Sequence, residues 1–316
     1  RNVSGWVDSL DHMRSFEPEY LFPSHTKPIE GEDATQALTI YRDAIQYIHD
    51  QTIRLMNKGY YPDEMVEMID LPYELASSSL LKEFYGTVRW SVRSIYNGYL
   101  GWFDGNPSSL DPLGNKVEAQ RIASLAGGKE NLFKSLEKAV AIEDMQWALQ
   151  LSDYLIDLQF KVVETNILRK EALFHIGIRA SNPNKRNYFL TSALELNPSF
   201  EGFPEVKKSE SVVNEIDVDT IFSILSVSFN PENSFKEKYS VCFRFDSGKL
   251  RAATIRNSTL EISKNIQSCN LNVSTSEKIL KETLAGLKSP VAMVASGAIN
   301  VEGSKVDFLK FLTSFK

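Results

Sequence analysis

The sequence predicts a multidomain chain in which an all-helical domain, built of helical hairpins, is followed by an α+β domain. Apolar residues recur every three or four positions almost throughout 32–196, as they do in amphipathic helices. A segment rich in Pro, Gly, Ser, Lys and Glu follows at 197–214. The period then changes to two at Tyr239–Phe245, as in a strand. The length of 316 residues agrees with about two domains.

The composition is that of a soluble globular chain, with 42% hydrophobic and 24% charged residues. Residues 1–213 contain 22 basic and 30 acidic side chains, and residues 214–316 contain 13 and 11. No clustered basic face is present, so we expect no nucleic-acid partner. The longest mostly apolar stretch, near Pro290–Ile299, is too short for a transmembrane segment. The first residue is Arg1 rather than Met, which favours a processed or truncated product; secretion or a periplasmic location stays open.

The helical domain is expected to be a series of antiparallel neighbours with short connections. Its first long helix is predicted over 34–56 and ends at Gly59. Further helices are predicted at 62–69, 86–100, 117–125, 129–142, 145–160, 164–180 and 184–196. The spacing of Trp147, Leu151 and Tyr154 resembles that of tetratricopeptide repeats. The long amphipathic faces exceed what one layer of helices can bury, which predicts a homodimer.

The second domain is expected to combine a small sheet with a few helices. Strands are predicted at 239–245, 250–255, 259–263, 270–274 and 298–301, and helices near 220–227, 278–284 and 306–315. Its aromatic and leucine side chains either enclose an alkyl chain or fill the core, and for most individual residues the core is favoured. They are Phe243, Phe245, Phe308, Leu309, Phe311, Leu312 and Phe315.

The two cysteines, Cys242 and Cys269, both lie in this second domain. A pair of cysteines in so long a chain is not a disulfide framework, and the spacing is not that of a zinc ribbon. A single bridge between neighbouring strands is one interpretation. Buried free thiols are the interpretation that we favour.

Histidine is scarce, and the sequence has no metal-binding histidine motif and no Gly-rich phosphate loop. His25 is expected in a Pro-bounded loop at a strand end, a place where metal ligands are often mounted. His49 and His175 are expected on helices, in structural roles.

Five blocks of sequence, in this order, resemble the alkyl sulfatases of the metallo-β-lactamase superfamily. The blocks are Pro23–Pro28, Tyr41–Ala44, His49–Thr52, Leu55–Gly59 and Tyr99–Pro107. The resemblance covers the whole chain but only the later half of such an enzyme. It implies the last elements of a metallo-β-lactamase-type domain at 1–31, a helical dimerisation domain at 32–200, a linker at 201–213 and a sterol-carrier-like domain at 214–316.

The resemblance also implies a zinc-dependent hydrolase of sulfuric esters. Its two zinc ions would be held mostly by residues of an upstream half, and only the final histidine ligand is carried over, onto His25. One histidine cannot hold a catalytic metal, because such sites need three or four protein ligands. The chain would supply dimerisation, one ligand and a hydrophobic guide for a long-chain alkyl ester.

One departure from the family concerns the substrate. Many alkyl sulfatases have a His-Asn pair where this chain has Trp90 and Ser91, and an indole cannot donate a proton as an imidazole does. A non-catalytic, dimeric amphiphile-binding protein is therefore the alternative function. Arg42, Arg89 and Arg93 are candidates for pairing with sulfate. Tyr99 and Trp102 either line the mouth of the site or belong to the core, and for Tyr99 we favour the core.

Overall fold

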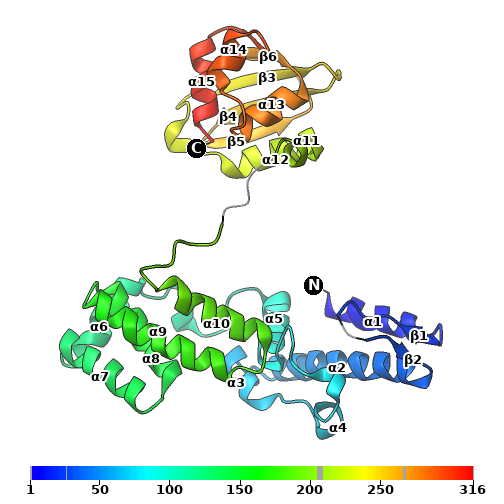
Figure 1. The fold of residues 1–316 in the computed structure, drawn as a ribbon, viewed down its shortest axis with the longest axis vertical. Coiled ribbons are helices and arrows are strands. Elements are labelled where there is room, and N and C mark those ends of the chain that lie inside the picture. Colours follow the sequence, from blue (N-terminus) through cyan, green and yellow to red (C-terminus); the bar gives the residue numbers. More distant parts are fainter. Residues whose placement is uncertain (1, 26, 205–208, 266–267, 316) are drawn as a thin grey trace. The chain divides into compact units, whose positions relative to one another are not determined.

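The computed structural model describes residues 2–25, 27–204, 209–265 and 268–315. The chain divides into two compact units, Arg1–Gly202 and Phe203–Lys316 (Figure 1). The first is helical apart from one short ribbon of two strands, and the second combines a five-stranded sheet with helices. The predicted fold class is therefore confirmed.

The helical unit has the following elements. They are α1 (Val3–Arg14), β1 (Tyr20–Leu21), β2 (Ile29–Glu30), α2 (Glu32–Met56), α3 (Pro62–Met68), α4 (Tyr73–Ala76), η1 (Ser79–Leu81), α5 (Val88–Leu100), η2 (Pro107–Ser109), α6 (Asn115–Leu125), α7 (Lys129–Ala141), α8 (Met145–Asp157), α9 (Val162–Arg179) and α10 (Pro183–Glu195). The eight helices predicted from periodicity are all present, with ends that differ by at most three residues. The short helices α1 and α4 were not predicted.

The longest helix, α2, is stabilised at both ends by charge. Glu32 and Asp33 lie in its first turn and Arg54 in its last, where each complements the helix dipole. Its C-terminal part packs against α3 and α5 through a small core that includes Leu55, Met65 and Val92. Helix α1 also packs against α2.

The second half of the helical unit is a stack of hairpins, α6 to α10 (Figure 1). Its core contains Leu136, Leu151, Leu155 and Ala172, all of them buried. Helices α9 and α10 approach closely at Gly177, where a Cβ atom would lie 2.8 Å from Cδ2 of Leu190. A larger residue there would push the two helices apart.

The second unit contains one mixed sheet with strand order β5-β4-β3-β6-β7. Strand β3 pairs parallel with β6, and the other pairs are antiparallel. The elements are α11 (Glu210–Glu215), α12 (Val218–Ser228), η3 (Pro231–Asn233), β3 (Tyr239–Phe245), β4 (Leu250–Arg256), β5 (Thr259–Ser263), β6 (Leu271–Thr275), α13 (Glu277–Leu284), α14 (Pro290–Ala295), β7 (Ile299–Glu302) and α15 (Lys305–Thr313).

Aromatic side chains fill the core between this sheet and its helices. Phe222, Phe243, Phe308 and Phe311 are each at most 1% exposed. The rings of Phe243 and Phe311 lie 6.0 Å apart, within the range of favourable aromatic pairs. The interpretation that the aromatic residues fill the core therefore holds for Phe243, Phe308 and Phe311, and Phe222 joins them.

The structure corrects two expectations for this unit. The segment assigned as linker contains the start of α11, whose C-terminal end is held by α13. Asn214 Nδ2 donates to Glu282 Oε1 at 3.1 Å, and Lys281 Nζ donates to the backbone oxygens of Asn214 at 2.6 Å and Ile216 at 2.9 Å. Lys281 and Glu282 are almost completely buried, so they require such partners. Composition alone does not reveal this anchoring.

The second correction concerns the cysteines, which form a disulfide instead of the free thiols that we favoured. Cys242 lies on β3 and Cys269 just before β6, with Cα atoms 5.8 Å apart. That distance is typical of disulfides. The two residues meet because β3 and β6 are neighbours in the sheet, although β4 and β5 lie between them in sequence.

Candidate functional site

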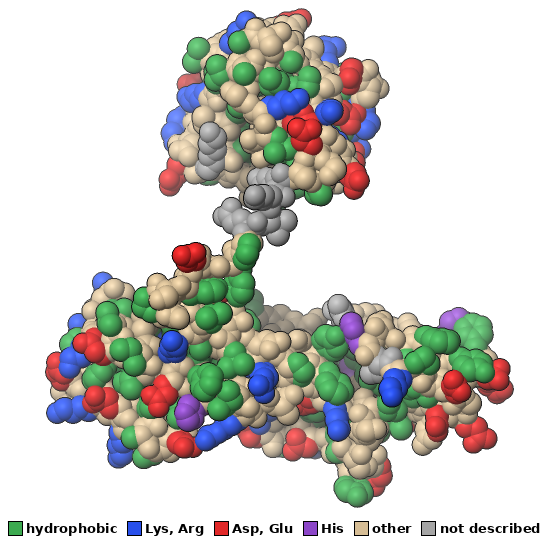
Figure 2. All heavy atoms as spheres, viewed as in Figure 1, with side chains coloured by type: hydrophobic (Ala, Val, Ile, Leu, Met, Phe, Trp, Pro, Cys, Tyr) green, Lys and Arg blue, Asp and Glu red, His purple; other side chains and the backbone are tan. Residues whose placement is uncertain are grey.

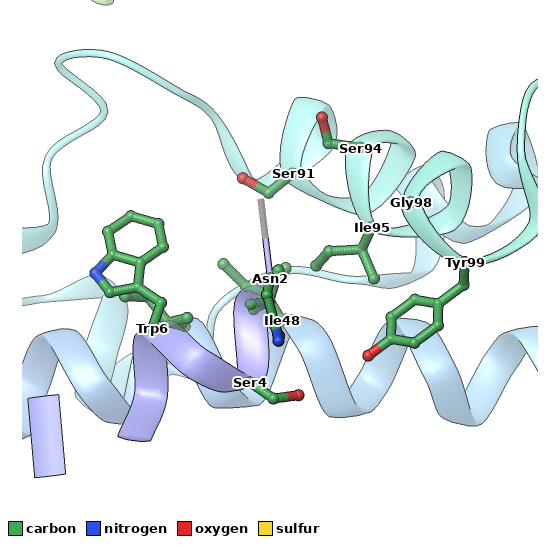
Figure 3. A pocket seen from close by; sticks show the side chains of 11 residues that line it. Asn2, Ser4, Trp6, Ile48, Ser91, Ser94, Ile95, Gly98 and Tyr99 are labelled. Carbon is green, nitrogen blue, oxygen red and sulfur yellow. The ribbon is translucent and has the colours of Figure 1, made fainter. Parts of the chain in front are cut away.

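The helical unit contains a cleft of about 850 Å³ between α1, α2 and α5 (Figure 3). Helix α2 contributes only apolar side chains to its wall, whereas α1 and α5 contribute both polar and apolar ones. The lining residues are Asn2, Val3, Ser4, Trp6, Ile45, Ile48, Ser91, Ser94, Ile95, Gly98 and Tyr99. A partly apolar cleft with a few hydroxyl groups suits a ligand that has both an apolar and a polar part.

The α5 wall of the cleft follows from helical spacing. Ser91, Ile95 and Tyr99 recur at intervals of four residues and so share one side of the helix. The helix begins at Thr87, whose hydroxyl accepts a hydrogen bond from the Trp90 backbone N–H at 3.1 Å. Ser91 Oγ donates to the backbone oxygen of Thr87 at 2.9 Å. The Ser91 hydroxyl oxygen therefore keeps a free acceptor position at the cleft wall.

Tyr99 is held at the cleft by a chain of hydrogen bonds from α2. Its hydroxyl lies 2.8 Å from His49 Nε2, and His49 Nδ1 lies 2.9 Å from Asp50 Oδ1. The bond to His49 holds the pKa of Asp50 below its ordinary value of 3.8. Figure 3 shows Tyr99 extending from α5 toward α2. Because Tyr99 is 54% exposed, the expectation that it belongs to the core is wrong.

The protonation state of His49 decides which groups donate and which accept in this row of hydrogen bonds. With Nδ1–H donated to the Asp50 carboxylate, Nε2 accepts from the Tyr99 hydroxyl, and the phenol oxygen offers only an acceptor to the cleft. When both ring nitrogens carry protons, His49 donates to both partners. The Tyr99 proton is then free to be donated to an anion in the cleft.

The other predicted substrate residues lie elsewhere in the helical unit. Trp90 is 43% and Trp102 71% exposed, and neither is among the described residues that line the cleft. The Trp102 ring contacts Phe103 edge to face, with centroids 5.8 Å apart. Of the two interpretations of Trp102, the core is wrong, and a contact with substrate at the mouth of the site stays a prediction.

The three candidate arginines are all paired with carboxylates. Arg42 contacts Asp11 on α1 at 3.0 Å and Asp43 at 3.1 Å. These bonds raise the pKa of Arg42, with Asp11 as the main cause. Arg89 pairs with Glu67 on α3, and Arg93 pairs with Asp63 at 2.6 Å. An anion would have to displace these carboxylates to bind here.

His25 lies in the loop between β1 and β2, as the prediction of a strand-end loop requires. Its side chain is exposed, and its ring lies 5.4 Å from that of Tyr85. The part of the chain that the structure describes contains no group of three or more His, Cys, Asp or Glu residues placed to hold a metal ion. The described residues therefore do not make a metal centre by themselves.

Sequence reasoning missed two contributors to the cleft, His49 and helix α1. His49 was assigned a structural role, and nothing in its local sequence indicates a contact with a residue fifty positions away. A signal for α1 does exist: Asn2 caps the helix by accepting from the Gly5 backbone N–H at 3.1 Å, and basic His12 and Arg14 lie in its last turn.

Among the described residues, no helix is both long and apolar enough to span a lipid bilayer.

Comparison with known proteins gives matches along almost the whole chain. The family described as alkyl sulfatase dimerisation matches residues 61–199, and the family described as alkyl sulfatase C-terminal matches residues 206–316. A linear primary-alkylsulfatase of Pseudomonas sp. is 33% identical over 98% of this chain and 61% of its own length. An alkyl/aryl-sulfatase of Saccharomyces cerevisiae is 26% identical over 100% of this chain and 50% of its own length.

A solved structure shares the fold. The stereoselective inverting sec-alkylsulfatase from Pseudomonas sp. superposes with a TM-score of 0.91 at 23% identity, over 100% of this chain and 51% of its own. The chain thus spans between 43% and 61% of the length of the curated relatives that it matches.

Proposed function

Because the chain belongs to the alkyl sulfatase family, we propose that it is the C-terminal part of a metal-dependent hydrolase of sulfuric esters. In this proposal the helical unit supplies homodimerisation, part of the substrate cleft and one metal ligand. The observation that carries the proposal is the cleft between α1, α2 and α5, where Ser91 and Tyr99 face apolar side chains. An alkyl sulfate has the same division into an apolar chain and an anionic head.

The proposed ligand contacts follow from this division. Ile45, Ile48 and Trp6 offer apolar surface to an alkyl chain, whose burial yields about 0.8 kcal/mol per methylene before the costs of association. Tyr99 can donate its hydroxyl proton to a sulfate oxygen when His49 does not accept that proton. Ser91 can do so by giving up its hydrogen bond to the Thr87 backbone oxygen. Trp90 and Trp102 remain proposed contacts for the part of the substrate's alkyl chain that extends out of the cleft.

Arg42 is proposed as a further sulfate contact. It would act by exchanging one of its carboxylate partners for the sulfate, since a guanidinium matches a tetrahedral oxyanion in two-point contacts. Arg42→Lys is the variant that tests this role, because it keeps the charge and loses the two-point geometry.

Binding of dodecyl sulfate to this chain, below the micelle concentration, tests the cleft. We expect Tyr99→Phe and Ser91→Ala to weaken binding in isothermal titration calorimetry by several-fold each, about 1 kcal/mol per lost hydrogen bond. Tyr188→Phe on α10 is the matched control, because Tyr188 is exposed and lies outside the cleft. Equal affinities for all three variants and the native chain would place the ligand elsewhere.

His25 is proposed as one ligand of a zinc site whose other ligands come from residues outside this chain. Zinc bound there would activate water for attack on the ester. We expect this chain alone to bind zinc no more tightly than a surface histidine does, and His25→Ala in the full-length protein to lower the metal content. Metal analysis with His12→Ala as control checks this, and an unchanged metal content in His25→Ala would remove His25 from the site.

A non-catalytic amphiphile-binding protein is the second candidate, favoured by Trp90 and Ser91 in place of the His-Asn pair of related enzymes. It predicts that the full-length protein binds alkyl sulfates without releasing sulfate. The amphiphile is then expected in the helical cleft, because Phe243, Phe308 and Phe311 are already buried in the second unit. A sulfate-release assay beside the titration separates the two functions.

A further inference from the structure

We propose that helix α9 forms a two-fold symmetric, antiparallel contact with α9 of a second copy of this chain. The contact surface, called the α9 stripe below, consists of Val163, Ile167, Phe174 and Ile178. These side chains are 72%, 61%, 51% and 43% exposed. The inference rests on the proposed function, in which the helical unit dimerises, and it names the surface that does so.

The α9 stripe lies on the side of the helix where polar residues are expected. At 100° per residue, its four side chains fall within an arc of about 60°. The opposite side is buried in the hairpin core through Thr165 and Ala172. Helix α9 already packs against α8 and α10, so the stripe is its outward face. Large apolar side chains in a continuous row on such a face mark an interaction site.

The order of residues along the α9 stripe is symmetric about a point between Lys170 and Glu171. Val163 and Ile178 lie equally far from this point, and so do Ile167 and Phe174. In an antiparallel pair crossing there, each apolar residue meets the apolar residue at the mirrored position of the second copy. The matched residues extend over about 22 Å of helix.

The charges at the centre of the stripe match the same arrangement. Lys170 and Glu171 are both exposed and flank the row of apolar side chains. With the two-fold axis between them, Lys170 of each copy meets Glu171 of the other. A parallel pair would instead place Lys170 against Lys170 and Glu171 against Glu171, which is unfavourable. The charges therefore favour the antiparallel pair.

A second copy of this chain is the occupant that these observations favour. An isologous interface requires a surface that is complementary to itself, and a symmetric row of side chains with opposite charges at its centre has this property. Helix α9 also lies within residues 61–199, which the dimerisation family matches.

Sedimentation equilibrium of this chain and two variants tests the stripe. We expect the native chain to form dimers, and Phe174→Asp and Ile167→Asp each to raise the dimer Kd by about 100-fold or more, as loss of a central contact does. Leu125→Asp is the matched control, since Leu125 is 84% exposed on α6, away from the stripe. Circular dichroism confirms that each variant is folded.

The outcomes separate this inference from the proposed function. A native chain that stays monomeric across micromolar concentrations contradicts both. A dimer that Phe174→Asp and Ile167→Asp leave intact contradicts only the α9 contact and shows that another surface dimerises. If either variant unfolds, the charge variants below decide, because their positions are exposed.

Charge exchange tests the antiparallel register. Lys170→Glu alone and Glu171→Lys alone are expected to raise the dimer Kd several-fold, and the double variant to restore it. Spin labels give a second readout: label pairs at position 170 should be closer than pairs at 167, and pairs at 163 the farthest apart. Equal distances at all three positions would overturn the antiparallel arrangement.

Discussion

The two units differ in where most of their aromatic side chains lie. In the second unit, aromatic residues from α12, β3 and α15 are buried together under a sheet whose central strands are joined by a disulfide. In the helical unit, many large apolar side chains remain on the surface, as the hydrophobic atoms in Figure 2 show. Trp102, Trp6 and Phe174 are each more than half exposed. Buried aromatic residues stabilise a fold, whereas exposed ones are available for ligands or partners.

The sharpest test of this contrast replaces one aromatic residue in each unit. Phe311→Ala is expected to lower the free energy of unfolding of the second unit by about 3–5 kcal/mol, because it leaves a cavity in a dense core. Trp102→Ala is expected to change that of the helical unit by less than about 0.5 kcal/mol. Urea denaturation followed by circular dichroism measures both. A similar loss in the two variants would show that Trp102 has a packing role.

Removing the disulfide should destabilise only the second unit. Cys242→Ala with Cys269→Ala opens a loop closed across a separation of 27 residues, which is expected to cost about 3 kcal/mol through the entropy of the unfolded chain. The midpoint temperature of the helical unit's unfolding transition should not change. The native chain under reducing conditions should unfold as the double variant does. Calorimetry under both redox conditions checks this, and a shift of both transitions would contradict the independence of the units.

Lowering the pH should weaken the contact between α11 and α13 before it lowers the stability of the helical unit. Hydrogen bonds from Lys288, the main cause, and from Asn214 hold the pKa of the buried Glu282 below its ordinary value of 4.5. A carboxylate whose pKa is lower in the folded than in the unfolded state stabilises the fold above pH 4.5, and this stabilisation is lost as the pH falls through the lowered pKa. We expect Glu282→Gln to be less stable near neutral pH and less sensitive to acid, as thermal melts between pH 3 and 7 would show.

A smaller effect is expected at the cleft. His49→Phe removes the hydrogen bonds to Tyr99 and Asp50 but keeps a ring on α2. Because Asp50 and Tyr99 are largely exposed, the free energy of unfolding should fall by no more than about 1 kcal/mol. The free energy of dodecyl sulfate binding should fall by more than the free energy of unfolding does. Loss of stability without loss of binding would make His49 a structural residue only.

Periodic patterns determined most elements from sequence alone. The strands Tyr239–Phe245 and Thr259–Ser263 occur at the predicted residues, since alternation and flanking turns mark their ends. Strand order left no such local signal, and so the pairing of Cys242 with Cys269 was not favoured. Contacts across long separations, such as His49 with Tyr99 or Lys281 with the end of α11, depend on tertiary packing in the same way.

The candidate site was predicted in fragments. Ser91 and Tyr99 share one side of α5 and line the same cleft. Arg42 instead joins α2 to α1 through Asp11, a role that its position on a helix did not reveal. Spacing predicts on which face of a helix a residue lies. It does not predict which other element packs against that face.

The parallel pairing of β3 with β6 has a consequence for the order in which the chain folds. Their pairing closes a loop that contains β4 and β5, and contacts of such long separation slow folding. In the hairpins α6 to α10, each helix packs against helices one or two places away in sequence. We therefore expect the stack of hairpins α6 to α10 to reach its native structure first, and the Cys242–Cys269 bond to form only when β3 and β6 have come together.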